Sequence, residues 1–230
     1  MKLITAGNIS DAVASSLREL GFDAVPTLEN TNVLSGLGYH PDMQLARVGN
    51  TVVCDPGLYD YYSDIFAGTS FKLLCGKAQT LCNYPQDVAY NIKVAENNVF
   101  HNFKYTDEVL LGLLDGMNKI DVSQGYSGCS ICTAGHDAII TADTVIHAAA
   151  LRHGIDSLLI SPGHIQLPGF NYGFIGGASF YHDGGLYFFG NVKTHPDFAQ
   201  IYDFCRNHGT RIYSLTTDEL YDYGGAVTLD

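Results

Sequence analysis

The chain has 230 residues, 46% of them hydrophobic, and a formal net charge of −12 from 12 Lys and Arg against 24 Asp and Glu. This length can bury a large core, and the acidic balance argues against a nucleic-acid partner and favours a small cationic molecule. No run of about eighteen apolar residues occurs, so we expect neither a transmembrane helix nor a membrane partner.

The six cysteines are dispersed along the chain without tight, even spacing. We therefore expect reduced thiols, as in a cytoplasmic protein. The apolar stretch near the N-terminus is too short for a signal peptide, which also favours the cytoplasm. The sequence carries no indication of the oligomeric state.

The first elements are predicted as a strand at residues 2–5, a helix at 10–20 and a strand at 22–27. Further strand-like triplets follow at residues 51–53, 138–140 and 186–188, with a looser match at 99–100. Two one-faced helices are predicted from apolar residues at helical spacing. They comprise Val109, Leu110, Leu113, Leu114 and Met117, with Thr106 as N-cap, and Phe198, Ile201, Tyr202 and Cys205. Gly21, Gly154 and Gly209 follow helices, where a positive φ ends a helix readily.

These elements form a unit of about 45 residues that recurs five times. The units are marked by aromatic residues at Tyr39, Tyr84, Tyr126, Phe174 and Tyr221, at intervals of 45, 42, 48 and 47 residues. Each unit reads strand, strand, helix, strand, and residues 225–229 supply the strand that the first unit lacks. Such a period, closed through the termini, predicts one α/β domain over residues 1–230, a five-bladed α/β propeller. Chance recurrence in an ordinary α/β domain is the alternative.

In a propeller the first strands of the blades line a central channel, so equivalent positions converge. Alternate residues of a strand share a face, which groups the polar residues His40, Asp42, Asp87, Ser127, Cys129 and Asp222. A thiol needs a base to become a nucleophile, and a carboxylate can orient that base. The group contains these residue types, so we expect a site with Cys129, His40 and Asp42.

His40-Pro41-Asp42 recurs as His195-Pro196-Asp197, where the proline is predicted to start a helix. The first copy precedes a predicted strand, which leaves functional and structural roles for His40 equally open. Asp42 and Asp87 could equally be turn residues that bond their own backbone.

Cys129 and Cys132 form a CxxC motif with His136 nearby. A zinc site normally needs a further pair of ligands, and strand residues three apart point to opposite faces. We therefore expect no metal and no cofactor, with Cys132 in the core and Cys129 facing the channel. A buried, inert Cys129 is the alternative.

The longest irregular connection covers residues 161–173, a length that is often functional. It contains His164 and Asn171, which are candidate substrate contacts, although a packed connection between blades explains the loop as well. The glycine-rich residues 173–179 lack the order of a phosphate loop, so tight packing is the better explanation.

The stretch from Gly125 to Gly225 contains short motifs at residues 125–130, 167–178 and 223–225. With these motifs the chain resembles the pentein superfamily of guanidine-modifying enzymes, and within it an uncharacterised bacterial family. The resemblance implies a cysteine thiolate that attacks a guanidinium carbon, a histidine acid and base, and carboxylates that hold the guanidinium. Similar enzymes carry a His-x-Asp motif with the cysteine two blades later, an order that His40, Asp42 and Cys129 share.

The resemblance thus implies a hydrolase or transferase for guanidine or amidine compounds, with Asp87 and Asp222 as further substrate-binding carboxylates. Family enzymes place the nucleophile near the end of the chain, where this sequence has Gly224-Gly225 and no cysteine. The superfamily also includes a noncatalytic factor. A noncatalytic pentein that binds a small molecule or a protein is therefore the alternative.

Overall fold

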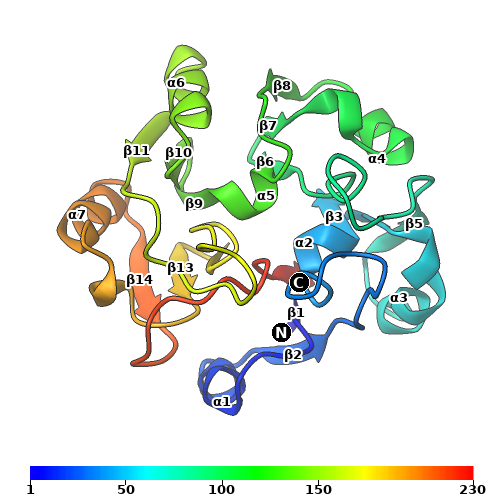
Figure 1. The fold of residues 1–230 in the computed structure, drawn as a ribbon, viewed down its shortest axis with the longest axis horizontal. Helices are drawn as coiled ribbons and strands as arrows, with labels where there is room; N and C mark the ends of the chain where they lie inside the picture. Colours follow the sequence, from blue (N-terminus) through cyan, green and yellow to red (C-terminus); the bar gives the residue numbers. More distant parts are fainter. Residues whose placement is uncertain (230) are drawn as a thin grey trace.

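The structure is a computed structural model that describes residues 1–229. It contains five three-stranded sheets. Figure 1 shows the sheets around a common centre, with α1, α3, α4, α6 and α7 at the periphery and the short helices α2 and α5 further in. The described residues include no helix that is long and apolar enough to cross a membrane.

The strands of each sheet are given in spatial order. The first sheet consists of β15 (Val227–Leu229), β1 (Lys2–Thr5) and β2 (Asp23–Pro26), and the second sheet consists of β3 (Leu45–Val48), β4 (Thr51–Cys54) and β5 (Lys72–Cys75). The third sheet consists of β6 (Lys93–Ala95), β7 (Asn98–His101) and β8 (Asn118–Asp121), the fourth of β9 (Ile131–Gly135), β10 (Ala138–Thr141) and β11 (Asp156–Leu159), and the fifth of β12 (Ser179–His182), β13 (Gly185–Phe188) and β14 (Arg211–Ser214). The helices are α1 (Asp11–Glu19), α2 (Pro41–Gln44), α3 (Tyr59–Phe66), α4 (Glu108–Gly112), α5 (Ser127–Ser130), α6 (Thr144–Arg152) and α7 (Phe198–Asn207), with 3₁₀ turns η1 (Pro56–Leu58), η2 (Phe103–Tyr105) and η3 (Val192–Thr194).

Every sheet has the same topology. The middle strand pairs antiparallel with the first strand and parallel with the third, which it reaches through a helical crossover. This confirms the five strand, strand, helix, strand units. In the first sheet the antiparallel partner of β1 is β15, with Leu3 opposite Thr228, so the C-terminal strand completes the N-terminal unit as predicted.

Aromatic packing joins the first unit to the last one. Phe22, between α1 and β2, is buried with its ring edge-on to Phe180 and Tyr187, at centroid distances of 5.4 and 5.2 Å. Phe180 and Tyr187 stack on each other at 4.8 Å, and Tyr187 stacks on Tyr213 at 4.6 Å. Such pairs stabilise packing beyond the apolar area that they bury, so residues far apart in the sequence hold the first and last units together.

The helix ends differ from the predictions in detail. The predicted N-cap Thr106 is wrong, because Asp107 caps α4 by accepting from Val109 N and Leu110 N, whereas Thr106 Oγ1 bonds His101 Nδ1 at 2.7 Å. Near the second His-Pro-Asp copy, α7 begins at Phe198, just after the Pro-Asp turn. The predicted positive φ is confirmed at the three glycines, with values of 86° at Gly21, 76° at Gly154 and 70° at Gly209.

The predicted strand placement of the candidate site residues is wrong. His40 is the N-cap of α2, with Pro41 at the first helical position, and Cys129 lies in α5. Both are one-turn helices that end directly at the first strand of a unit. For α2 the reason is local, because Pro41 fixes a helical φ and removes the N–H that a strand would need. The candidate residues therefore precede the strands that they were predicted to occupy.

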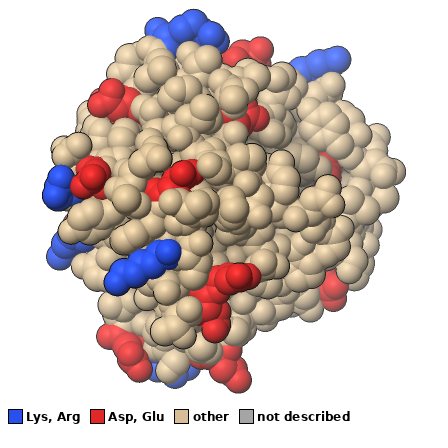
Figure 2. Space-filling view, turned by 60° about the vertical axis from the view of Figure 1, so that its left-hand side comes forward, with Lys and Arg blue, Asp and Glu red and all other residues tan. Residues whose placement is uncertain are grey.

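Charged side chains are scattered over the face of the molecule shown in Figure 2. The Lys and Arg side chains on this face stand apart from one another, and several lie beside Asp or Glu side chains. They form no continuous basic patch there, in keeping with the net charge of −12. A phosphate backbone is bound through clustered Lys and Arg, so this face offers no such surface.

Candidate active site

The five segments that precede the first strands are joined at the centre of the fold. Hydrogen bonds connect each segment to the next and return to the starting one. They run from Asp42 N to Gly224 O at 3.3 Å, Gly225 N to Gly177 O at 2.8 Å, Gly177 N to Cys129 O at 2.9 Å, Gly128 N to Asn91 O at 3.0 Å, and Asn91 Nδ2 to Asp42 O at 3.2 Å. This circuit of hydrogen bonds fixes the candidate side chains relative to one another.

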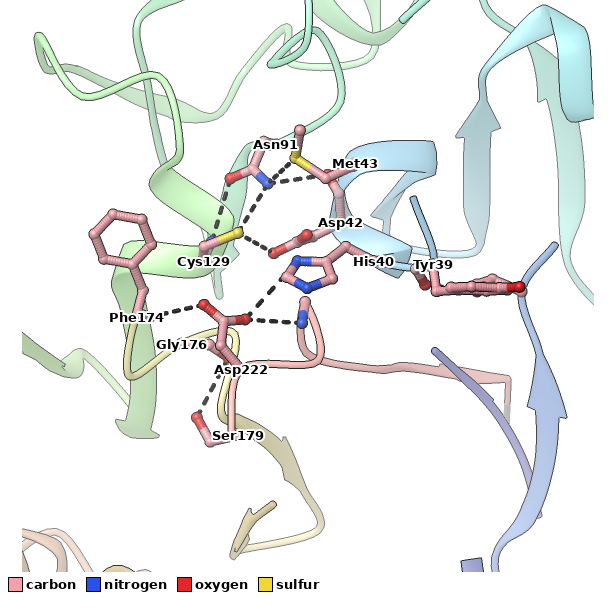
Figure 3. A network of polar contacts seen from close by, with 12 residues as sticks. Tyr39, His40, Asp42, Met43, Asn91, Cys129, Phe174, Gly176, Ser179 and Asp222 are labelled. Carbon is pink, nitrogen blue, oxygen red and sulfur yellow. Dashed lines mark hydrogen bonds and ion pairs between the residues drawn. The ribbon is translucent and has the colours of Figure 1, made fainter. Parts of the chain in front are cut away.

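The thiol of Cys129 is buried within this circuit, at 3% exposure. Its Sγ donates to Asp42 Oδ2 at 2.8 Å and accepts from Asn91 Nδ2 at 3.2 Å. The amide of Cys129 in turn donates to Asn91 Oδ1 at 3.2 Å, as Figure 3 shows. The thiol position is thus set by one carboxyl group and one amide.

His40 and Asp222 lie on the other side of the thiol (Figure 3). His40 Nδ1 is 3.9 Å from Asp222 Oδ1, and Asp222 accepts from Phe174 N at 2.7 Å and Gly224 N at 2.9 Å. The polar atoms of His40, Asp42 and Cys129 all lie within 4.8 Å of one another. A thiol, an imidazole and two carboxyl groups thus meet in one place.

Glycines allow this close approach. Gly224 has a φ of 73°, and a Cβ atom there would overlap the Cβ of His40. At Gly177 a Cβ atom would overlap the carboxyl group of Asp222. The glycine-rich stretch therefore packs against the site, in agreement with the predicted packing role.

Burial determines the protonation of the resting site. It lowers the pKa of His40, raises the pKa of Asp42 to about 8, raises that of Asp222, and raises that of Cys129 well above its ordinary value. The negative charges of Asp42 and Asp222 raise the Cys129 pKa further. The positive charge of Lys93 on β6 lowers the pKa of Asp42 and so partly offsets the effect of burial. Without a ligand, the thiol and Asp42 are therefore protonated near pH 7.

Two cavities meet at this cluster. The smaller one, of about 250 Å³, is lined by Leu37, His40, Tyr126, Cys129, Leu167, Phe170, Asn171, Tyr172, Phe174 and Asp222. The larger one, of about 470 Å³, has Asp42, Arg47 and Lys93 among its lining residues. The thiol faces the smaller cavity, and its partner Asp42 faces the larger one.

The other predicted site residues fall into two groups. Asn171 lines the smaller cavity, as the long loop of residues 161–173 forms one of its walls. Asp87 does not line it, because its carboxylate accepts from Tyr126 OH at 2.5 Å. His164 is exposed and its ring lies edge-on to His195, at 5.4 Å between centroids.

One residue that contacts the thiol, Asn91, was missed by the sequence analysis. The repeat was counted forward from Tyr84, which selected Asp87 as the equivalent position. Asn91 lies two residues before β6, as Cys129 lies two residues before β9. Counting backward from the first strand of each unit would have found it.

The residues that could hold a metal ion are His40, Asp42 and Cys129, which offer one nitrogen, one oxygen and one sulfur. The CxxC motif does not contribute a second thiol, because Cys132 lies in the core with its side chain among apolar residues. His136 is exposed and pairs with Asp137 at 2.8 Å. The placement of Cys132 agrees with the prediction.

The sequence of this chain matches the Family of unknown function (DUF6873) over residues 4–227, and the chain belongs to that family. No curated protein sequence matches it significantly. The fold is that of the pentein superfamily, as several solved structures of similar architecture show.

Three of these structures cover nearly all of the chain. The DDAH of Pseudomonas aeruginosa in complex with citrulline has a TM-score of 0.59 at 7% identity, over 94% of this chain and 92% of that one. An amidinotransferase of saxitoxin biosynthesis from Microseira wollei has a TM-score of 0.54 at 11% identity, over 100% of this chain and 94% of that one. The inosamine-phosphate amidinotransferase of Streptomyces griseus has a TM-score of 0.55 at 12% identity, over 95% of this chain and 78% of that one. At such low identities the likeness extends to the fold alone.

Proposed function

We propose that this protein is an enzyme that acts on a small guanidine or amidine compound, with Cys129 as nucleophile and His40 as acid and base. The observation that carries the proposal is the convergence of His40, Asp42 and Cys129 within 4.8 Å, beside a cavity of about 250 Å³. Asp222 completes the group. The similar fold of DDAH and of two amidinotransferases supports the same class of compound.

The carboxyl groups of Asp42 and Asp222 are the proposed partners of the cation. They lie on either side of the thiol. Asp222 is buried, and Asp42 Oδ1 is a buried atom with no hydrogen-bond partner among the described residues. A planar guanidinium presents paired N–H donors that match carboxylate oxygens. A cation bound there satisfies the free oxygen and places its central carbon beside Cys129.

Binding of the cation also prepares the nucleophile. The resting thiol is protonated because burial and two carboxyl groups raise its pKa. A positive charge within a few ångströms lowers the pKa of a thiol and of a carboxyl group. The substrate itself therefore favours the thiolate. The thiol proton passes to His40, which is neutral at rest because burial lowers its pKa and which lies within 4.8 Å of the thiol.

In the first chemical step, Cys129 Sγ forms a bond to the guanidinium carbon. The bond from that carbon to the departing amine then breaks, and the amine takes its proton from His40. In a hydrolase, water attacks the sulfur-bound carbon and gives a proton to His40. The C–S bond then breaks, and the thiolate takes that proton from His40 to restore the thiol. In a transferase an acceptor amine replaces that water. Both outcomes use the same residues.

The test is turnover of a panel of guanidines and amidines, including arginine, agmatine, methylarginines and simple alkylguanidines. We expect the wild-type protein to release an amine from at least one compound and Cys129→Ala to release none. Cys82→Ala is the matched control, because Cys82 is exposed and does not line the cavity. Absence of turnover with every compound, together with no reaction of Cys129 with 2-chloroacetamidine, would reject the proposal.

A second candidate is a noncatalytic pentein that binds a small cation in the same cavity. Two observations favour it: the raised pKa of the Cys129 thiol and the absence of a cysteine from residues 221–230, around Gly224-Gly225. It predicts that Cys129→Ala retains ligand affinity and that the wild-type protein consumes no ligand. The turnover experiment separates the two candidates.

For the architecture we propose a single-domain five-bladed α/β propeller closed by β15, supported by the pairing of β15 with β1 and by the central circuit of hydrogen bonds. For the location we propose the cytoplasm. The free state of all six cysteines accords with a reducing compartment. Fractionation of the native host, with thiol titration of the recovered protein, tests the location.

A further inference from the structure

The wall of the smaller cavity, as the described residues form it, lacks a Lys or Arg side chain. Of its ten lining residues, six are Leu, Phe or Tyr. Its charged or titratable groups are chiefly the ones that hold and attack a guanidinium, namely His40, Cys129 and Asp222. The cations Arg47 and Lys93 line the larger cavity, beyond Asp42. A carboxylate on the substrate would therefore have no ionic partner in this wall.

The outer part of the cavity is aromatic. The rings of Tyr126 and Phe174 are stacked, with centroids 6.4 Å apart and an interplanar angle of 26°, and Tyr172 meets Phe174 edge-on at 6.4 Å. Phe170 and Tyr172 are 38% and 41% exposed. These rings offer a surface to the part of a ligand that extends outward from the thiol.

The energetics of this wall discriminate between substituents. An anion loses its hydration in an apolar wall and gains no compensating partner. The faces of aromatic rings also carry negative partial charge, which attracts cations and apolar groups and disfavours anions. The net charge of −12 acts in the same direction over longer distances.

We infer that the site accepts small N-substituted guanidines whose substituent is apolar or aromatic, and that it discriminates against guanidines that carry a carboxylate, such as amino acids. This inference rests on the proposed function, because it takes the guanidine group to lie between Asp42 and Asp222. The inference concerns the substituent on the guanidine group, which would lie against the loop of residues 161–173. The cavity volume of about 250 Å³ is below the usual range for drug-sized ligands and fits a short substituent.

The test compares matched ligands that differ in one group. Affinities of propylguanidine, benzylguanidine and 3-guanidinopropionate are measured by calorimetry with the Cys129→Ala protein, which binds without reacting. Turnover of the same three compounds is measured with the wild-type protein. We expect propylguanidine and benzylguanidine to bind at least about tenfold more tightly than 3-guanidinopropionate, a difference that one uncompensated carboxylate readily produces.

A gain of function provides the second arm. Asn171 lines the cavity and is exposed, so Asn171→Arg adds the missing cation without removing a buried contact. We expect this variant to bind 3-guanidinopropionate about tenfold more tightly than the Asn171 protein does, with no gain for propylguanidine. Tyr202→Arg on α7, at another exposed position outside the cavity lining, is the control and should change neither affinity.

The outcomes distinguish this inference from the proposed function. Turnover with a preference for 3-guanidinopropionate, or turnover with equal affinity for all three compounds, overturns the inference about specificity and leaves the proposed enzymatic function standing. Preferential binding of propylguanidine without turnover retains the inference about the ligand and rejects the catalytic function. Absence of binding by all three compounds overturns both.

Discussion

The thiol of Cys129 and the carboxyl group of Asp42 lie 2.8 Å apart, although 87 positions separate the two residues in the sequence. The contact couples their protonation. The charge of Asp42 raises the pKa of Cys129, whereas the hydrogen bond from Cys129 partly offsets the burial that raises the pKa of Asp42. The pair therefore holds its protons until a cation arrives.

The first prediction concerns Asp42→Asn, measured in a Cys75→Ser/Cys82→Ser background that removes the exposed thiols. Loss of the negative charge lowers the pKa of Cys129, so alkylation of Cys129 by neutral iodoacetamide at pH 8 should accelerate, by up to about tenfold for each pKa unit. Turnover of guanidines should instead fall by about 100-fold, because a partner of the cation is lost. Parallel loss of both rates would mean that Asp42 only maintains the structure.

The second prediction concerns Lys93, whose positive charge favours the ionised form of Asp42. Burial lowers the pKa of Lys93 itself, against the raising effect of Cys132, Asp42 and Cys129. By reciprocity, Lys93→Met should raise the pKa of Cys129 and slow its alkylation by iodoacetamide several-fold at pH 8. The pH profile of the alkylation rate is the measurement. Lys104→Met, in the η2 turn outside both cavity linings, is the control and should leave the profile unchanged.

The third prediction concerns stability as a function of pH. The pKa of Asp42 is about 8 in the folded protein, against an ordinary value of 3.8, so the folded state holds a proton that the unfolded state releases between these values. Stability must therefore decrease as pH rises toward 8, by up to about 1.4 kcal/mol per pH unit for one group. The lowered pKa of His40 makes stability rise with pH, but only below pH 6.5, the ordinary pKa of histidine.

The melting temperature should thus fall between pH 6.5 and 8 in the wild-type protein, and the fall should be smaller in Asp42→Asn. A residual slope is expected, because burial also raises the pKa of Asp222. Identical slopes for the two proteins would contradict the assigned protonation of Asp42.

The fourth prediction separates backbone strain from steric overlap at the glycines. Gly224→Ala places a methyl group against His40 at a φ of 73°, whereas Gly21→Ala has a φ of 86° with no atom within 4 Å of the new Cβ. Gly21→Ala should cost about 1–2 kcal/mol of unfolding free energy from strain alone. Gly224→Ala should cost at least about 1 kcal/mol more, since overpacking adds to the strain. Equal losses in denaturant titrations would exclude the close contact with His40.

The repeat made much of the fold predictable from the sequence. Because each unit carries its own strand triplet, helix pattern and terminating glycine, the order of elements and the exchange of β15 with the first unit could be inferred from residues alone. The placement of His40 and Cys129 in strands was wrong. One-turn helices such as α2 and α5 are too short to produce a periodic pattern, and only Pro41 signalled one of them.

The candidate site was predictable in part, because equivalent positions of a repeat converge. His40, Asp42, Cys129 and Asp222 were grouped by this argument, and the structure brings their side chains together. Asp87 and His164 lie elsewhere because their side chains pair with Tyr126 and His195. These contacts depend on loop conformations that no local pattern encodes. The same applies to the aromatic wall, to which the loop of residues 161–173 contributes Phe170 and Tyr172.

The proposed guanidinium-binding thiol site is tested most directly by site-specific labelling of the Cys75→Ser/Cys82→Ser protein. Cationic 2-chloroacetamidine and neutral iodoacetamide are compared, with peptide mapping by mass spectrometry. Because Asp42 and Asp222 flank the thiol, we expect Cys129 to be the labelled residue, the cationic reagent to react faster, and Asp222→Asn to remove this advantage. Equal rates for the two reagents at Cys129, or labelling of other cysteines only, would contradict a thiol site built to receive a guanidinium.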